Sequence, residues 1–144
     1  MGVWNNFAVL GKVEEEDKTL AEQLKVLLAD VTILYHIVHG FHWNVRGINF
    51  AQFHEFFEAI YEDADGSIDP IAENIRKLGF NAPFRLQDFL ESTNEAEPTD
   101  TNDPAAMCRS LYQSNQDVLE CIVHAIAVAD ELEEQGIVNF LSEI

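Results

Sequence analysis

The residues best suited to chemistry in this sequence lie between His42 and Glu73. From His54 onward, side chains that can bind a metal recur at intervals of four, four, three, four and four residues. That spacing follows one face of an α-helix. The donors are imidazoles and carboxylates without a thiolate, a set that suits iron, with zinc or manganese as substitutes, and iron is favoured for redox chemistry. The ligand-type residues are His42, His54, Glu58, Glu62, Asp65, Asp69 and Glu73.

The two ends of this ligand stripe cannot bind the same metal ion within one chain. His54 and Glu73 are 19 residues apart (73 − 54), which is about 28 Å along a helix, whereas metal–ligand distances are about 2 Å. Either each chain holds two sites, or two chains meet about a two-fold axis. Such an axis brings the histidine end of one chain against the carboxylate end of the other and makes two equal sites.

Two long helices are predicted to position these residues. The first covers about residues 18–45 and the second about residues 50–78, because apolar side chains recur in both at steps of three and four. Asn49 is suited to cap the second helix. The apolar stripes consist of Leu20, Leu24, Leu27, Val31, Leu34, Val38, Phe41 and Val45 in the first helix, and of Phe53, Phe57, Ile60, Ala64, Ile68, Ile71, Ile75 and Leu78 in the second.

The next part of the chain predicts a short helix, a long connection and a third long helix. The short helix covers about residues 85–90, and the polar stretch 91–102 is typical of a loop that crosses back along the molecule. Such a crossing allows the second and third helices to lie parallel. Asp103 and Pro104 form a cap followed by proline at the first helical position, so the third helix is predicted to begin there.

The end of the chain predicts only the start of a fourth helix. Gly136 is predicted to end the third helix, and the apolar residues within 137–144 begin a new stripe that stops with the sequence. The fourth helix is therefore expected to be truncated. The fold class is all-α: residues 1–16 form a tail, and residues 17–144 form a four-helix bundle domain with a short extra helix in the middle connection.

The ligand stripe of the second helix does not coincide with its apolar stripe. The two are offset by one residue, or ~100° around the helix axis, and His42 is offset in the same way from Phe41. The ligand-type residues therefore flank the bundle core. A di-metal carboxylate site in the centre of a bundle uses Glu-x-x-His on two helices, which this sequence lacks. The offset favours a site at a contact with another chain.

Other interpretations of the same residues stay open. Alternatively, the stripe is a solvated charged face with two incidental histidines, because runs of charged residues on helices usually form such faces. His39 is either a proton relay or an interface histidine. Trp43, next to His42, either packs or takes up stray oxidising equivalents from a nearby metal.

The composition excludes several classes of function. The net charge is −18, from 26 acidic and 8 basic residues among 144, which argues against DNA binding by direct charge contact. The sequence has no continuous run of 18 apolar residues and no signal peptide, so no membrane span and a cytoplasmic location are expected. Cys108 and Cys121 are predicted to share one helix about 20 Å apart, too far for a disulfide.

Two segments resemble signatures of the Dps-type mini-ferritins. The first is His-Trp-Asn-Val-Arg-Gly at 42–47, followed by Asn-Phe at 49–50 and Phe-His-Glu at 53–55. The second is Asp-Pro-Ile-Ala-Glu-Asn-Ile-Arg at 69–76, close to the usual form of Asp, three residues, Glu-Arg. The short middle helix is also similar, and the likeness covers about residue 20 to the end of the sequence.

This resemblance implies a ferroxidase and iron-storage shell of twelve ferritin-like four-helix subunits. In such a shell Fe(II) is oxidised in pairs by hydrogen peroxide or oxygen, and the ferric mineral is stored inside. Each site at a two-fold contact takes His42 and His54 from one subunit and Asp69 and Glu73 from its neighbour. Glu58 stands where the family usually has Asp.

The sequence departs from the family pattern in three places. Its N-terminus carries only Lys12 where many members have a Lys-rich tail that binds DNA, so DNA binding is not expected. Asp130 and Glu134 are candidates for an acidic iron-uptake route, although Gln135 and Asn139 stand where acids are common. The fourth helix is shorter. A DNA-compacting shell and a structural helical oligomer with a vestigial metal site are the alternative functions.

Overall fold

The computed structural model describes residues 15–98 and 100–144. Within these ranges the chain forms helices and no strand, which confirms the all-α prediction. The predicted tail at 1–16 lies outside the described residues except for its last two, which begin the first helix. The elements are α2 (Glu15–Asn44), α3 (Phe50–Lys77), α4 (Leu86–Ser92), α5 (Pro104–Glu131) and α6 (Gln135–Glu143).

Helix α2 is the central element of the bundle. It contacts α3, α4 and α5, and all eight apolar residues predicted for its stripe, from Leu20 to Val45, are buried. The stretch Asp17–Asn44 is long and apolar enough to cross a membrane by length and composition, but 61% of its most apolar window is buried inside the structure. Its apolar character therefore serves the bundle core, with each buried leucine stabilising the fold by about 1.5–3 kcal/mol.

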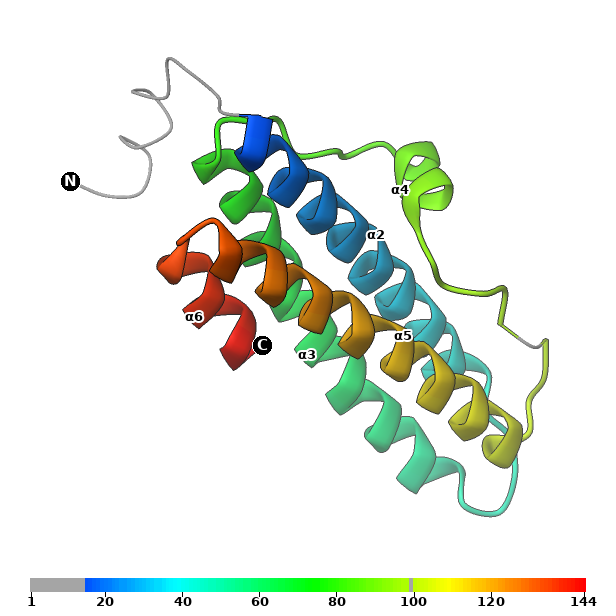
Figure 1. Cartoon of the computed structure of the whole chain (residues 1–144). Coiled ribbons are helices and arrows are strands. Elements are labelled where there is room, and N and C mark those ends of the chain that lie inside the picture. Colours follow the sequence, from blue (N-terminus) through cyan, green and yellow to red (C-terminus); the bar gives the residue numbers. More distant parts are fainter. Residues whose placement is uncertain (1–14, 99) are drawn as a thin grey trace.

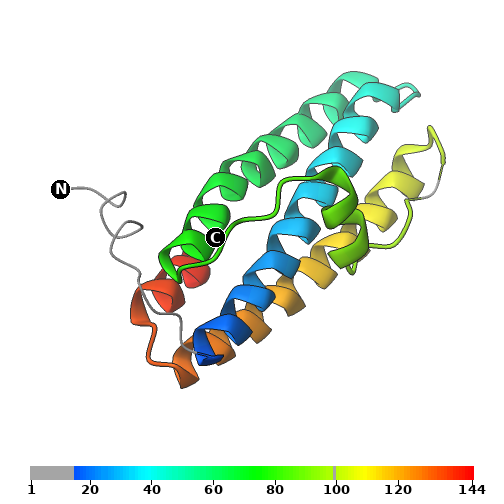
Figure 2. The same ribbon diagram turned by 90° about the horizontal axis from the view of Figure 1, so that it is seen from above.

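The connection through α4 sets the direction of the third long helix. Helix α3 returns antiparallel to α2, and the segment from 78 to 103 then crosses the length of the molecule past α4, so that α5 runs parallel to α3 (Figures 1 and 2). Asp103 caps α5 by accepting a hydrogen bond from the backbone N–H of Ala106 at 2.9 Å. The predicted crossing loop is confirmed.

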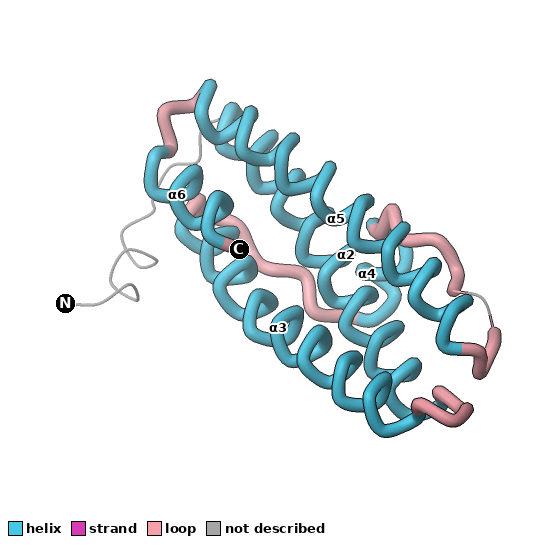
Figure 3. The backbone as a smooth tube through the Cα atoms, turned by 90° about the horizontal axis from the view of Figure 1, so that it is seen from below, coloured by secondary structure: helices cyan, strands magenta, loops and turns pink. Residues whose placement is uncertain are grey.

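The end of α5 differs from the prediction. The helix ends at Glu131, before Gly136, and the chain reverses at Glu133, whose φ is 59°. A non-glycine residue holds this left-handed conformation while Glu134 N–H donates to the Ala129 carbonyl at 2.9 Å. Gly136 instead lies inside α6, a nine-residue helix that folds back beside α5 (Figure 3).

A buried carboxylate attaches the crossing segment to the central helix. Asp30 on α2 is fully buried, and its Oδ1 accepts hydrogen bonds from Thr93 Oγ1 and Asn94 N, both at 2.7 Å. The carboxylate oxygens of Glu95 are shielded from solvent beside it. Burial raises the pKa of Glu95 to about 7, the nearby Ser114 opposes the shift, and the charge of Asp30 adds to it.

This raised pKa predicts a stability that falls with pH. The folded chain holds the Glu95 proton more tightly than the unfolded chain, so stability is lost as pH rises from about 4.5 to about 7. We expect Glu95→Gln to be more stable than the parent at about pH 8 by about 1–2 kcal/mol, because no charge is then buried. Thermal unfolding followed by circular dichroism at about pH 5 and pH 8 measures the difference. Glu97→Gln, at an exposed position nearby, is the control. Equal pH dependence in all three proteins would contradict the prediction.

Candidate metal site

The two predicted histidine ligands face each other across the turn between α2 and α3. His42 lies in the last turn of α2 and His54 near the start of α3. Their imidazole rings are stacked, with centroids 3.6 Å apart and an interplanar angle of 18°. Gly47 allows the tight turn between them with a φ of 128°. His42 is buried and His54 half-buried, so the pair lies at the edge of the bundle core.

Reciprocal hydrogen bonds fix the tautomer of both rings. His42 Nδ1 lies 2.7 Å from the backbone oxygen of His54, and His54 Nδ1 lies 2.8 Å from the backbone oxygen of His42. A carbonyl oxygen only accepts, so each Nδ1 must carry the hydrogen and donate it. In the neutral form of each ring, Nε2 then keeps a lone pair. Metal-binding histidines are oriented by this kind of hydrogen bond, so the pair fits an iron ligand role.

Glu58 follows His54 by one helical turn on α3 and is half-buried. Desolvation raises the pKa of Tyr61, and the charges of Glu58 and Glu62 raise it further. Because it follows His54 by four residues, Glu58 lies on the same side of α3 as His54.

A group of aromatic rings extends from the histidine pair along α2 and α3. The Tyr61 ring packs edge-on against His42, with centroids 5.2 Å apart. His39 stacks on Tyr61 at 4.3 Å and contacts Trp43 at 4.1 Å. Sequence reasoning singled out His39 and Trp43 but missed Tyr61, although its position seven residues after His54 places it on the same helix face.

The carboxylate end of the ligand stripe lies apart from the histidine pair. Asp69 is exposed and Glu73 half-buried on the later part of α3. Within residues 15–98 and 100–144, no group of three or more His, Cys, Asp or Glu side chains is close enough to hold a metal ion. The structure of one chain brings together His42 and His54, and it does not bring Asp69 and Glu73 to them.

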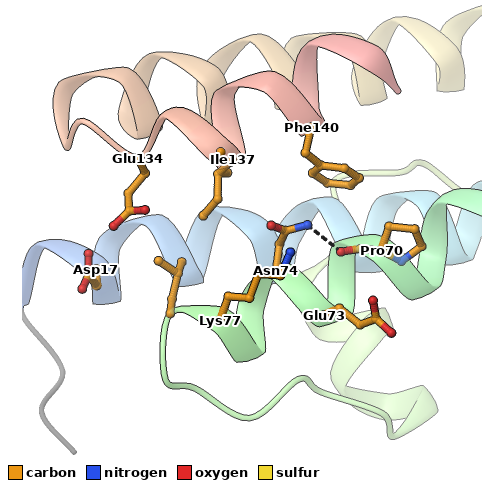
Figure 4. Close-up of a pocket in the computed structure, with 10 residues that line it drawn as sticks. Asp17, Pro70, Glu73, Asn74, Lys77, Glu134, Ile137 and Phe140 are labelled. Atoms are coloured by element: carbon orange, nitrogen blue, oxygen red, sulfur yellow. Dashed lines mark hydrogen bonds between the residues drawn. The ribbon is translucent and has the colours of Figure 1, made fainter. Parts of the chain in front are cut away.

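Glu73 and Glu134 both line a pocket of about 400 Å³ between α3 and α6 (Figure 4). Glu134 points toward Asp17 in this view, and burial together with the Asp17 charge raises the pKa of Glu134. Asp130, the other candidate for iron uptake, is exposed near the end of α5. The two candidate residues therefore differ in their surroundings.

Comparisons with known proteins agree with this fold. The ferritin-like domain family matches residues 21–144, and a crystal structure of a Dps protein from Vibrio cholerae, described as a member of the ferritin-like diiron-carboxylate superfamily, is similar with a TM-score of 0.86. It shares 28% identity and covers 89% of this chain and 80% of that one. The fold is thus that of a ferritin-like helical bundle.

Two further relatives identify the family within this fold class. A protein named DNA protection during starvation protein, from Brevibacillus brevis, is 34% identical over 132 residues, which is 88% of this chain and 89% of the relative. A crystal structure of a Dps protein from Bacillus brevis has a TM-score of 0.87 at 31% identity, over 92% of this chain and 89% of that one. The chain belongs to the Dps-type mini-ferritins.

Proposed function

We propose that this chain is the subunit of a ferroxidase that oxidises Fe(II) with hydrogen peroxide or oxygen and stores the ferric product in a hollow shell. The observation that carries the proposal is the stacked pair of His42 and His54, whose Nδ1–H groups are both used by backbone carbonyls. Two adjacent imidazoles, together with the Glu58 carboxylate one helical turn further along α3, supply donor types that suit iron.

The site is proposed to be shared between two subunits. One subunit supplies His42, His54 and Glu58, and its two-fold neighbour supplies Asp69 and Glu73. The separation of the two half-sites along α3 supports this arrangement, because an isologous contact reverses the direction of the partner helix. We further propose that twelve subunits assemble from such dimers, as the likeness to Dps proteins suggests.

The residues would favour iron oxidation in two ways. Carboxylate oxygens stabilise Fe(III) more than Fe(II) because the interaction grows with the charge of the ion. Two Fe(II) ions held at one site together supply the two electrons and, with two protons from water, reduce one peroxide to two water molecules. No hydroxyl radical is then released. Zinc or manganese would occupy the same donors without performing this reaction.

The acidic balance of the chain supports its proposed role with cations. The net charge of −18 attracts Fe(II) to the surface, since the fields of many carboxylates add. We propose that Asp130 and Glu134 lie on the uptake route for iron. Asp130 is exposed and free to meet hydrated ions, whereas Glu134 is partly buried against Asp17.

The test uses the purified oligomer, loaded with Fe(II) without oxygen and then mixed with hydrogen peroxide. We expect the ferric absorbance to grow rapidly and to saturate at about two irons for each shared site at the two-fold contact. Zn(II) added first should compete for the same donors and slow the reaction. Fe(II) oxidation by the wild-type protein that is no faster than in buffer without protein would overturn the proposal.

DNA compaction is the competing function, suggested by the name of the Brevibacillus relative. The net charge of −18 opposes the counterion release that drives DNA binding. We expect no retarded band in a gel-shift assay with linear duplex at about 50 mM salt. A Dps protein with a Lys-rich tail is the positive control. Retardation by this chain at that salt concentration would contradict the prediction.

We propose a cytoplasmic location. Cys108 and Cys121 are free thiols on α5, as expected in a reducing compartment. Burial raises the pKa of the Cys121 thiol to about 12, with the nearby Asp30 adding to the shift. This thiol stays protonated and is a poor nucleophile.

A further inference from the structure

Two carboxyl groups meet where the segment after α4 lies against the bundle. Asp30 on α2 is fully buried, and its Oδ1 accepts hydrogen bonds from the hydroxyl of Thr93 and the backbone N–H of Asn94, both at 2.7 Å. The Thr93 hydroxyl oxygen accepts in turn from the backbone N–H of Glu95 at 3.0 Å. The Thr93 N–H donates to the carbonyl of Phe89 at 3.0 Å, at the end of α4. Asp30 therefore holds both the end of α4 and the first residues that follow it.

The side chain of Glu95 turns into the same region. Both of its carboxylate oxygens are shielded from solvent and, within residues 15–98 and 100–144, make no hydrogen bond. Ser114 on α5 lies nearby, and the charges that act on Glu95 are those of Asp30 and Asp117. An ionised Glu95 would bring a further negative charge into a site that already holds like charges. The protonated form lacks this penalty.

We propose that Asp30 and Glu95 form a proton-dependent latch that holds the segment 93–98 and the end of α4 against the bundle. With Glu95 protonated, the hydrogen bonds from Thr93 and Asn94 to Asp30 keep the segment closed. When Glu95 loses its proton, its charge favours an open arrangement in which water solvates the carboxylate. The segment then leaves Asp30, while α2, α3 and α5 stay packed.

Opening of the latch would also loosen α4. This helix has seven residues, of which Phe89 is buried, and so short a helix is not stable without contacts that hold it. The outer face of α4 exposes Leu86 and Leu90. The latch thereby makes the position of this apolar surface depend on pH.

Opening is expected to become easier as pH rises. Burial raises the pKa of Glu95 from 4.5 to about 7 in the closed arrangement, and solvation returns it to its ordinary value in the open one. The stabilisation of the closed form is complete below about pH 4.5 and is lost as pH rises to about 7. From about pH 5 to pH 8, the equilibrium constant for opening should rise about 10- to 100-fold.

Other titratable groups lie on α5 beside the segment. Asn94 lines a pocket of about 420 Å³ together with Asp117, Glu120, Cys121 and His124. Burial, with a contribution from Asp30, raises the pKa of the Cys121 thiol to about 12, so it stays protonated over this range. Histidine side chains ordinarily titrate between pH 5 and 8. His124→Gln is therefore the matched control for Glu95→Gln.

The experiment is hydrogen–deuterium exchange of the purified oligomer at about pH 5 and pH 8, read by mass spectrometry on peptides that cover residues 93–98. Each rate is divided by the rate of the unstructured peptide at the same pH. We expect protection of this segment to fall about 10- to 100-fold at the higher pH in the wild type and in His124→Gln, and to stay constant in Glu95→Gln. Thr93→Val removes the hydroxyl that Asp30 accepts from, so it should lower the protection already at pH 5. A peptide from the core of α2 that contains Leu24 should be equally protected at both pH values.

Equal protection of the segment at both pH values in the wild type would overturn the inference. A fall that persists in Glu95→Gln would do so too, and a fall that disappears in His124→Gln would make His124 the titrating group. Unchanged protection in Thr93→Val at pH 5 would show that the hydrogen bonds to Asp30 do not hold the segment. A parallel loss of protection in the α2 core would mean that the whole bundle opens and that no local latch exists.

Discussion

Mixed oligomers of His42→Ala and Glu73→Ala subunits are expected to oxidise Fe(II), although each variant alone is inactive. Each single variant loses one ligand at every site, and we expect its rate to fall by more than about 100-fold, since even loss of the groups that orient a ligand costs 10–100-fold. In a dimer that contains one of each, one shared site carries both substitutions and the other carries neither.

The expected size of this recovery follows from the two-fold geometry. With equal amounts and random pairing, about half of the dimers are mixed and half of their sites are intact, so about one quarter of wild-type activity returns. Co-expression with two different affinity tags yields the mixed oligomer, and ferric absorbance measures the rate. No recovery would contradict a site shared in this way.

A second mixture is the matched control. His42→Ala and His54→Ala remove ligands from the same proposed half-site, and their rings stack within one chain. Every site in a mixed dimer then lacks one histidine, so we expect no recovery. Recovery in this control would mean that the His42 and His54 of one chain belong to two different shared sites.

Charges on the outer face of α4 are expected to disperse the oligomer and abolish ferrous oxidation. Leu86 and Leu90 are 70% and 64% exposed, while Phe89 is turned into the core of the same helix. We propose that these exposed apolar side chains lie at a contact with another subunit. Leu86→Glu with Leu90→Glu would bury two unpaired charges at that contact, at a cost of several kcal/mol.

Light scattering and sedimentation measure the outcome. We expect the wild type at about twelve times 16.3 kDa and the double variant at the mass of a monomer, with Fe(II) oxidation lost although all five proposed ligands are intact. Ser92→Glu adds a charge at an exposed polar position of the same helix and should leave mass and rate unchanged. A double variant that stays assembled, or that oxidises Fe(II) as a monomer, would contradict the prediction.

Much of the fold follows from periodicity alone. All eight stripe residues predicted for α2 are buried, as are Phe57, Ala64, Ile71, Ile75 and Leu78 of the second stripe. Steps of three and four fix which residues share a helix face, and the polar stretch 91–102 was long enough to indicate a crossing. The end of α5 was predicted wrongly because Glu133, a residue without intrinsic turn preference, adopts the left-handed conformation where the chain reverses.

The sequence by itself determined the helical faces, the types of donor on them and the distance that separates His54 from Glu73. It did so because rise and periodicity are properties of a single helix. Only the tertiary structure decided which faces meet. The turn at 45–49 stacks His42 on His54 and fixes both tautomers, and α2 brings His39 against Tyr61. Those contacts depend on how two helices pack, and periodicity within each helix carries no information about the position of its neighbour.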